Sequence, residues 1–303
     1  MCFPIFQRAP VYKLLSFYKY IHLDDLSKLQ ADILNFCMSN SLRGKIYLAG
    51  EGINGNISGE GSGVESFREF MTTIPEFSDV WFKEDSTESY VYSKMHVRIK
   101  KELVHLGIEG QTNEHSGKRL KPADLVDLYA SGKEFIIVDT RNRYESEVGY
   151  FEGALRPEMK NFREWGEIAD NLAEYKDKTV VTYCTGGIRC EKASAVLLAK
   201  GFRDVYQLDG GIITFVKQFP DTIWKGGVFV FDERKVLEPN QKPELKYGSH
   251  CLFCNADTNY YINCHNLECD KLFVVCKSCA EHNEYCCSSA CKETNTKRTR
   301  IYT

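Results

Sequence analysis

Apolar residues recur along the first hundred residues with two different periods. Residues 24–40 repeat them every three or four positions, as one face of an amphipathic helix does, and Asp24 or Asp25 stands where an N-cap is expected. The apolar positions of this predicted helix are Leu26, Leu29, Ile33, Phe36 and Cys37. A second helix is predicted at 64–74, and strands are predicted at 13–20, 45–50, 80–86 and 95–103, with a short one in the turn-rich segment EGINGNIS.

The order of these elements is β-α-β-β-α-β. This order is typical of a ferredoxin-like (acylphosphatase-like) α+β sandwich, which we expect over residues 1–110. The polar stretch QTNEHSGKRLK, residues 111–121, predicts a linker after it.

Residues 120–232 alternate short apolar strands with helices, which predicts an α/β domain with a mostly parallel sheet. Helices are predicted at 120–132 and 191–202, and strands at 135–140, 178–184 and 204–211.

From residue 246 the chain becomes rich in cysteine, and nine of its 13 cysteines lie between Cys251 and Cys291. Two C-x-x-C pairs within one short segment predict a zinc-binding module over residues 246–293. The simplest assignment builds one four-cysteine site from Cys251, Cys254, Cys276 and Cys279. A second site would use Cys264, Cys269, Cys291 and either Cys286 or Cys287, although an interleaved pairing fits the sequence equally well. His250, His265 and His282 are alternative ligands, and residues 294–303 form a basic tail that we expect to be mobile.

Bulk properties narrow the class of protein. The 303-residue chain has a formal net charge of −3, so an anionic partner would have to be bound by local basic patches. The first residues have no apolar core or cleavage site typical of a signal peptide, and no run of about 18 apolar residues predicts a membrane span. Since the cysteines have metal-like spacing, we expect a cytoplasmic zinc protein and not a disulfide scaffold.

The candidate chemistry lies in the segment TVVTYCTGGIRCEKAS. A buried strand is expected to place Cys184 at its carboxyl end, the edge where open α/β sheets bind their ligands. The curled loop after it can aim several N–H groups at the sulfur; its residues are Thr185, Gly186, Gly187 and Ile188. Arg189 and the start of a helix add positive charge. These features lower the pKa of a thiol, so we expect Cys184 to be a thiolate nucleophile or a persulfide carrier near an opening.

Spacing separates two kinds of cysteine loop. Tyrosine-phosphatase loops place five residues between Cys and Arg, whereas four separate Cys184 from Arg189, as in rhodaneses. The upstream segments DTRNRYE and GYFEGAL resemble the rhodanese pattern D-x-R-x-x-x-E followed by G-H-I-x-G-A, with Tyr150 in place of the usual His. We expect Asp139, Arg141 and Glu145 to form structural ion pairs that support the loop. Cys190 is either a resolving thiol for Cys184 or a helix residue that faces the core.

Basic and aromatic residues also suggest a place where RNA could bind. Lysines and arginines concentrate between residues 94 and 121 and in the tail: Lys94, Arg98, Lys100, Lys101, Lys118, Arg119, Lys121, Lys297, Arg298 and Arg300. Tyr90 and Tyr92 could stack on bases. A solvated strand face and a frayed end would have the same composition.

Together these motifs resemble those of the rhodanese-domain tRNA uridine hydroxylases. The segments SFYKY, YLAGEGINGNIS, VDTRNRYESEVGYFEGA, YCTGGIRCEKAS, GGI and FVFDER and the cysteine cluster follow the family's order. The resemblance implies oxygen-dependent conversion of the wobble uridine (uridine 34) of tRNA to 5-hydroxyuridine. It also implies that tRNA is the partner, molecular oxygen the co-substrate and Cys184 the essential residue.

Other functions remain open from the sequence alone. A rhodanese-type sulfurtransferase would carry a persulfide on Cys184, and a binding module would use only the zinc cluster and the basic segments. No flavin or nicotinamide fingerprint is visible, because the GEGSG segment at 59–63 lacks the G-x-G-x-x-G spacing. Neither an iron-binding triad nor a protein partner can be predicted.

Overall fold

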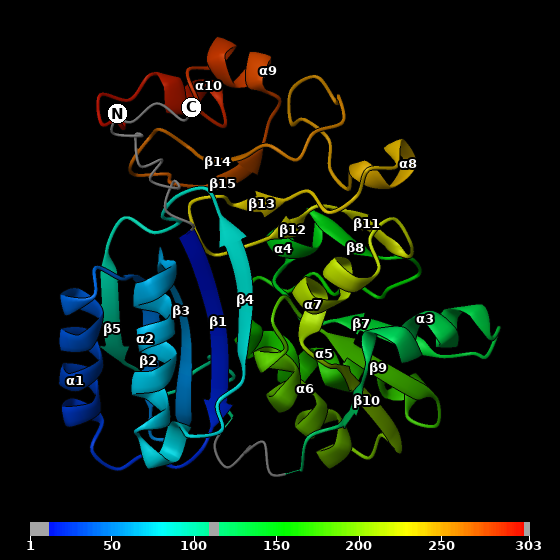
Figure 1. Ribbon diagram of the computed structural model, residues 1–303. Helices are drawn as coiled ribbons and strands as arrows, with labels where there is room; N and C mark the ends of the chain where they lie inside the picture. Colours follow the sequence, from blue (N-terminus) through cyan, green and yellow to red (C-terminus); the bar gives the residue numbers. More distant parts are fainter. Residues whose placement is uncertain (1–11, 109–114, 300–303) are drawn as a thin grey trace, which may run out of the picture. The chain divides into compact units, whose positions relative to one another are not determined.

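The computed structural model describes residues 12–108 and 115–299. Its chain forms two compact units that divide after His105, and Figure 1 shows them coloured from blue to red along the sequence. Each unit is described by itself. Among the residues that the structure describes, no helix combines the length and the apolar character that a membrane span requires.

The first unit is the expected ferredoxin-like sandwich. Its five-stranded sheet has the order β4-β1-β3-β2-β5, and β5 pairs parallel with β2 at one edge. The helices α1 and α2 lie side by side in front of the sheet in Figure 1. The elements are β1 (Tyr12–Tyr20), α1 (Leu26–Ser39), β2 (Arg43–Ala49), β3 (Gly52–Glu60), α2 (Gly61–Thr72), the 3-10 helix η1 (Pro75–Phe77), β4 (Phe82–Thr87) and β5 (Met95–Ile99).

Local sequence explains why α1 forms and which face it buries. Asp25 caps the helix, since its carboxylate accepts a hydrogen bond from the backbone N–H of Lys28 at 3.0 Å. The predicted apolar face packs into the core, where Ile33 and Cys37 have no exposed surface. Burial raises the pKa of the Cys37 thiol to about 12, so this cysteine is a protonated packing residue.

The second unit begins with an α/β domain whose four strands are all parallel, in the order β6-β10-β9-β7. The strands are β6 (Lys118–Leu120), β7 (Ile136–Asp139), β9 (Thr179–Tyr183) and β10 (Asp204–Leu208). The helices are α3 (Pro122–Ala130), α4 (Arg143–Ser146), α5 (Trp165–Asn171), α6 (Ile188–Ala199) and α7 (Gly211–Gln218), with 3-10 turns η3 (Phe162–Glu164) and η4 (Ala173–Tyr175). Val181 and Tyr183 pack into the core that α3 and α7 share, and their neighbours Val180 and Thr182 are buried as well. Both faces of β9 are therefore covered.

Two predictions about this domain are wrong in part. The expected linker 111–121 includes β6, because residues 118–120 pair with β10 in spite of their polar composition; residues 109–114 lie outside the described part. The strand expected at 204–211 ends at Leu208, since Gly210 and Gly211 adopt positive φ angles and begin α7.

The rest of the second unit leads into the cysteine-rich module. Short antiparallel pairs join β8 (Gly149–Phe151) to β11 (Trp224–Gly226), β12 (Val228–Phe229) to β13 (Val236–Leu237) and β14 (Tyr261–Asn263) to β15 (Leu272–Val274), with α8 (Pro243–Lys246), α9 (Lys277–His282) and α10 (Ser289–Lys292) between or after them. The Ser249 hydroxyl ties the module to the α/β domain by donating to the Glu147 carbonyl at 2.6 Å.

The basic tail contacts the cysteine-rich module where the structure describes it. Lys297 forms a β-bridge with Asn266 and an ion pair with Glu284, and Arg298 pairs with Asp270. The tail therefore packs on the module up to residue 299, and Arg300 lies outside the described residues.

Candidate active site

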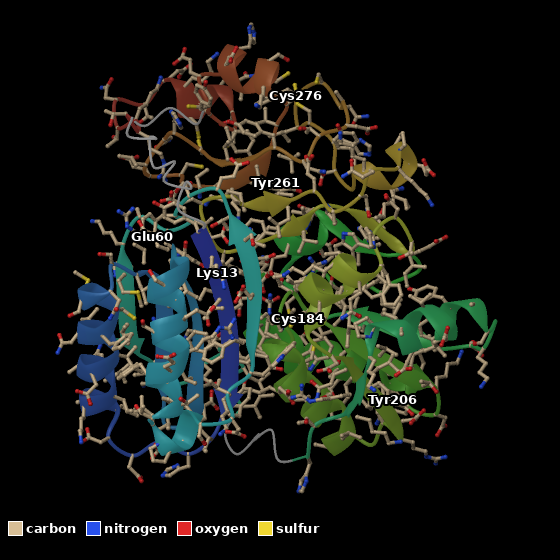
Figure 2. All side chains as sticks on the ribbon, viewed as in Figure 1. Lys13, Glu60, Cys184, Tyr206, Tyr261 and Cys276 are labelled. Atoms are coloured by element: carbon tan, nitrogen blue, oxygen red, sulfur yellow. The ribbon has the colours of Figure 1, made fainter. Side chains whose placement is uncertain are left out.

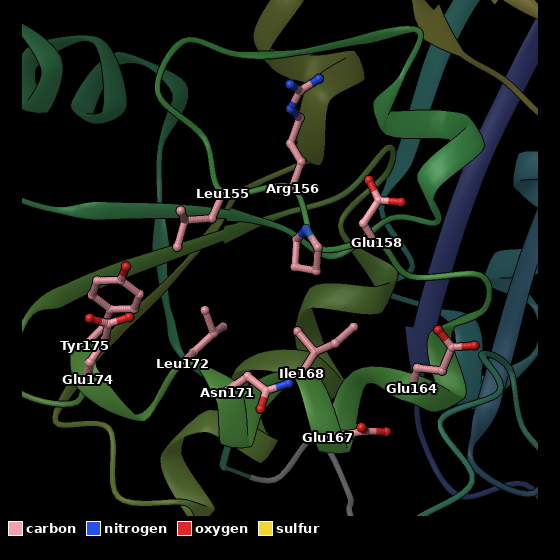
Figure 3. A pocket seen from close by; sticks show the side chains of 11 residues that line it. Leu155, Arg156, Glu158, Glu164, Glu167, Ile168, Asn171, Leu172, Glu174 and Tyr175 are labelled. Carbon is pink, nitrogen blue, oxygen red and sulfur yellow. The ribbon is translucent and has the colours of Figure 1, made fainter.

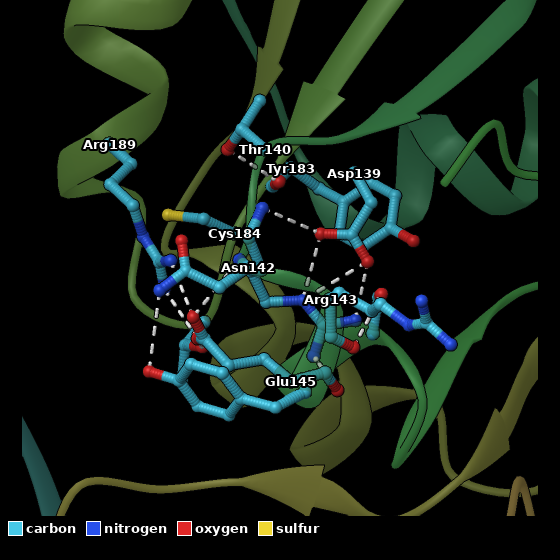
Figure 4. Close-up of polar contacts among 12 residues, drawn as sticks. Asp139, Thr140, Asn142, Arg143, Glu145, Tyr183, Cys184 and Arg189 are labelled. Carbon is cyan, nitrogen blue, oxygen red and sulfur yellow. Dashed lines mark hydrogen bonds and ion pairs between the residues drawn. The ribbon is translucent and has the colours of Figure 1, made fainter. Parts of the chain in front are cut away.

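The loop that follows β9 holds Cys184 at the carboxyl end of the parallel sheet, as predicted. Gly187 makes the turn into α6 with a φ of +100°, which glycine adopts without strain, and its backbone N–H donates to the Cys184 sulfur at 3.1 Å. Figure 2 shows Cys184 within the α/β domain. In Figure 4 its sulfur lies above Asn142 and Glu145 in the view, on the side of Arg189.

The surroundings of Cys184 favour a thiolate. Burial alone raises the pKa of this thiol, but a hydrogen bond from the Cys190 thiol, the charge of Arg189 and the backbone N–H groups of Arg189 and Gly187 act in the opposite direction. Together they lower the pKa of Cys184 from 9.0 to about 5. The expected activation of this cysteine therefore has a structural basis.

The sulfur of Cys184 does not reach the surface of the protein. Cys184 has no exposed area, whereas the neighbouring loop residues Gly186 and Ile188 are half-buried and the Arg189 side chain is 11% exposed. The expected opening at the sulfur is thus wrong for this conformation, because the loop curls over the atom that it stabilises. A substrate can reach the sulfur only after a local movement.

Glu145 holds Arg189 in place through two hydrogen bonds. The two guanidinium Nη atoms donate to the two carboxylate oxygens at 2.7 and 2.6 Å, and Glu145 has no exposed surface. The carboxylate also lies 3.4 Å from the Thr185 hydroxyl, and it accepts from the backbone N–H of Asn142 at 3.2 Å. Because a paired fork of this kind fixes the plane of the guanidinium, Glu145 orients Arg189 toward the loop (Figure 4).

Asp139 and Arg141 form a separate buried ion pair. The Arg141 Nε and Nη2 atoms donate to the Asp139 carboxylate, and Arg141 also donates to the carbonyl oxygens of Glu145 and Gly149 at 3.2 and 2.6 Å. These contacts tie β7 to the α4–β8 segment. Tyr150, in the place of the pattern's histidine, lies under the Arg156 guanidinium at 3.8 Å and is half-buried.

Cys190 is a helix residue that faces the core, which is one of the two alternatives that the sequence allowed. It lies in the first turn of α6 with no exposed surface, and its thiol hydrogen-bonds the Cys184 sulfur. Burial and this interaction raise the pKa of Cys190 well above its usual value. Cys190 is therefore the protonated donor of the pair and Cys184 the anionic acceptor.

The sequence analysis did not identify the start of α7 as part of the site. Gly211 has a φ of +68°, and a Cβ atom there would lie 2.6 Å from the Cys184 carbonyl oxygen and 2.8 Å from the Gly187 nitrogen. The backbone N–H groups of Ile212 and Ile213 donate to the Cys184 and Thr185 carbonyls at 3.0 and 3.2 Å. The pair Gly210-Gly211 in the sequence could have indicated this contact, because only glycine lets the backbone come so close to the cysteine loop.

A surface pocket of about 550 Å³ lies elsewhere on the α/β domain, between the segment after β8 and the helix α5 (Figure 3). None of the residues 184–189 lines it. Glu158, Glu164, Glu167 and Glu174 do. Because four carboxylates repel phosphate groups, this pocket is a poor site for a nucleic acid.

The cysteine-rich module gathers eight thiols into two groups of four. One consists of Cys251, Cys254, Cys276 and Cys279, and the other of Cys264, Cys269, Cys287 and Cys291; within each, all the sulfurs lie within 4.8 Å of one another. Along the chain, neighbouring cysteines belong in turn to the first and the second group: Cys251 and Cys254, then Cys264 and Cys269, then Cys276 and Cys279, then Cys287 and Cys291. A tetrahedral ion bound at about 2.3 Å requires sulfurs about 3.8 Å apart. The Cys254–Cys276 and Cys269–Cys287 sulfur distances are both 3.7 Å, so the groups fit a metal ion.

The structure also decides between the alternative ligands. Cys287 and not Cys286 joins the second group, because the Cys286 sulfur contacts the Cys291 carbonyl at 3.3 Å. None of the three histidines belongs to either group: His250 pairs with Asp257, and His265 stacks on Tyr285. The two groups coincide with the simplest assignment made from the sequence, with Cys287 as the fourth member of the second group.

The basic residues predicted to bind RNA separate into two sets. Four of those in the second unit form ion pairs within it: Lys118 pairs with Asp204, Arg119 pairs with Glu191 and Asp209, and Lys297 and Arg298 pair with Glu284 and Asp270. Those of the first unit lie on or next to β5 and are considered below.

Family comparisons cover almost all of the described chain. The model of the "UPF0176 acylphosphatase like domain" matches residues 12–103, that of the "Rhodanese-like domain" residues 121–218, and that of the "Rhodanase C-terminal" region residues 225–292. Among solved structures, a rhodanese-like domain protein from Staphylococcus aureus is 27% identical with a TM-score of 0.28, and the likeness covers 32% of this chain and 90% of that chain.

Named relatives match about nine tenths of the chain. The tRNA uridine(34) hydroxylase of Bacillus licheniformis is 42% identical over 90% of this chain and 85% of its own length. The protein of the same name from Staphylococcus carnosus is 40% identical over 89% of this chain and 90% of its own length. That from Acholeplasma laidlawii is 38% identical over 93% of this chain and 89% of its own length. Because relatives of this name are 38% to 42% identical over about nine tenths of its length, the chain belongs to the tRNA uridine(34) hydroxylase family.

Proposed function

We propose that this chain hydroxylates uridine 34 of tRNA at C5, with Cys184 as the reactive residue. The observation that carries the proposal is the identity of 42% to a named hydroxylase over 90% of the chain. The site adds the chemistry, because a thiol with a pKa of about 5 is ionised at neutral pH without any cofactor.

In the proposed mechanism the Cys184 thiolate adds to C6 of the uracil ring. The addition places negative charge on C5 and on the O4 enolate, and C5 then takes up an electrophilic oxygen atom. Loss of the C5 proton and departure of Cys184 restore the ring. In sum, one atom of molecular oxygen enters the C5–H bond, and the other leaves as water with two protons and two electrons from an external two-electron reductant.

Arg189 is suited to hold the developing enolate oxygen. Glu145 occupies one N–H on each of its two terminal nitrogens, and a guanidinium has five N–H donors in all. The remaining donors and the loop amides would stabilise negative charge near Cys184, as an oxyanion hole does.

Zinc is the metal that we assign to the two cysteine groups, because four thiolates and a tetrahedral spacing suit this ion best. All four positions of each site are taken by protein sulfurs, so the role of the metal is structural. From the proposed tRNA substrate we infer a cytoplasmic location.

Mass spectrometry of tRNA nucleosides tests the proposal. A strain that lacks this gene and other routes to the product would be complemented with the wild type, with Cys184→Ser or, as a control, with Cys37→Ala, which alters a buried cysteine of the first unit. We expect 5-hydroxyuridine derivatives with the wild type and the control, and none with Cys184→Ser. Growth under ¹⁸O₂ would put the label into the nucleoside. Undiminished product with Cys184→Ser would refute the proposal.

A rhodanese-type sulfurtransferase is the second candidate. The contact of 3.1 Å between the Gly187 N–H and the Cys184 sulfur favours it, since a loop of amides would also stabilise a persulfide anion. Thiosulfate–cyanide turnover by the purified protein would support this activity. Turnover without any tRNA hydroxylation would replace the first proposal with it.

A further inference from the structure

The sheet of the first unit has one face that α1 and α2 do not cover. Along β2 the buried residues Ile46 and Leu48 point to the helices, so Lys45 and Tyr47 point the other way. On β5 the same alternation turns Arg98 outward, opposite the buried Val97.

The register of the strands brings these side chains together. Tyr47 of β2 is paired with Arg98 of β5, and on its other side it is paired with Asn54 of β3. Two more cations join them: Arg43 at the start of β2, and Lys100, whose Nζ lies 5.4 Å from the centre of the Tyr47 ring. We call this set the β2–β5 face; it consists of Arg43, Lys45, Tyr47, Arg98 and Lys100.

The cations of this face have no ion-pair partner within the described chain. None of its four cations takes part in a salt bridge among residues 12–108 and 115–299, whereas Lys13, Lys19 and Arg68 of the same unit all pair with carboxylates. Arg43, Lys45 and Arg98 are exposed. Four cations thus gather on one face of a chain whose net charge is −3, so the basic character is local.

Aromatic rings accompany the cations. The Arg43 guanidinium lies 4.0 Å from the centre of the Tyr90 ring, and Tyr47 is half-buried in the middle of the face. Cations bind the phosphates of a nucleic acid, and aromatic rings stack on unpaired bases. In the RNA-recognition motif, aromatic side chains on an open four-stranded sheet stack on bases in the same way.

We propose that the β2–β5 face binds single-stranded RNA, with Tyr47 stacked on a base and Lys45 and Arg98 in contact with phosphates. This inference rests on the proposed function, which makes tRNA the substrate, and it assigns the unpaired anticodon loop to this face. A paired stem is a poorer ligand, because its bases are already stacked on one another and leave no ring for Tyr47.

The test is fluorescence anisotropy with the full-length protein and a labelled anticodon stem-loop, titrated at several salt concentrations. Lys45→Ala/Arg98→Ala removes two phosphate contacts, and the control Lys28→Ala/Lys133→Ala removes two exposed lysines from α1 and from the turn after α3. For single strands the slope of log K against log salt falls by about 0.7 for each contact, so we expect the first pair to reduce it by about 1.4 and the control to leave it unchanged.

Two variants of Tyr47 distinguish the contribution of base stacking to RNA binding from that of charge. Tyr47→Ala should weaken binding by about 5- to 150-fold, the range for loss of one stacked base, and Tyr47→Phe should bind as the wild type does because it keeps the ring. Melting curves would establish that the variants are folded.

Three results would overturn the inference: a salt slope that Lys45→Ala/Arg98→Ala leaves unchanged, equal binding of a fully paired duplex, or no RNA binding by the wild type. None of these measurements needs turnover. An enzyme that binds the stem-loop through this face but yields no 5-hydroxyuridine would therefore refute the proposed function alone.

Discussion

Replacement of Cys190 by alanine tests how the protein ionises Cys184. Both thiols are buried, and the hydrogen bond from Cys190 is the largest of the contributions that lower the pKa of Cys184. Alanine removes this donor and leaves Arg189 in place. Serine at the same position keeps a hydroxyl donor, so Cys190→Ser is the matched control.

A hydrogen bond to a charged group contributes about 1.5–3 kcal/mol, and one pKa unit corresponds to about 1.4 kcal/mol. Loss of the Cys190 donor should therefore raise the pKa of Cys184 from about 5 to between about 6 and 7. In the wild type about 99% of the sulfur is ionised at pH 7 if the pKa is about 5. Because only the thiolate reacts with alkylating agents, reactivity should be constant above pH 6 and fall as the pH drops through the pKa.

The assay is alkylation by iodoacetamide from pH 4 to 10, followed by mass spectrometry of the peptide that contains Cys184. Burial slows the reaction at every pH, but the midpoint of the profile still gives the pKa. We expect midpoints near 5 for the wild type and for Cys190→Ser, and a higher midpoint for Cys190→Ala. A wild-type midpoint near that of free cysteine, or the same midpoint in Cys190→Ala, would refute the reasoning.

Three further predictions concern the supporting structure. Glu145→Gln leaves Arg189 as a buried cation without its partner, so urea unfolding should show a loss of about 3–5 kcal/mol, and an unchanged unfolding free energy would contradict the pairing. Gly211→Ala forces a Cβ against the Cys184 carbonyl oxygen at a φ of +68°. The melting temperature should therefore fall, and the alkylation midpoint of Cys184 should rise. An unchanged alkylation profile would show that the close contact between Gly211 and the cysteine loop is not required. Cys287→Ser should lose one of two bound zinc ions by elemental analysis, whereas Cys286→Ser should keep both, and the reverse result would overturn the ligand assignment.

Several features could be predicted because they depend on neighbouring residues. The amphipathic period of α1 identified the face that packs on the sheet, and the strand-loop-helix pattern around Cys184 located the candidate site. The strand β6 could not be predicted in this way. Two of its three residues are exposed and charged, and the third, Leu120, is half-buried. They form a strand only because β10, almost ninety residues later, supplies their hydrogen-bond partners.

The basic residues show the same limit. The sequence analysis placed Arg98 and Arg119 in one basic segment. In the structure Arg119 forms ion pairs with Glu191 and Asp209, whereas the cations beside Arg98 come from β2. Strand register, which no local pattern encodes, decides which charges share a face.

The sequence by itself determined the chemistry: a cysteine in a glycine-rich loop before a helix, an arginine five positions later, and pairs of thiols at metal spacing. These depend on residue type and on backbone preferences over a few positions. The tertiary structure decided that Glu145 holds Arg189 from 44 residues away, that Gly211 closes on the loop, and that Cys287 completes the second thiol group. Such contacts form only when packing brings distant segments within a few ångströms, and neither composition nor local spacing specifies that distance.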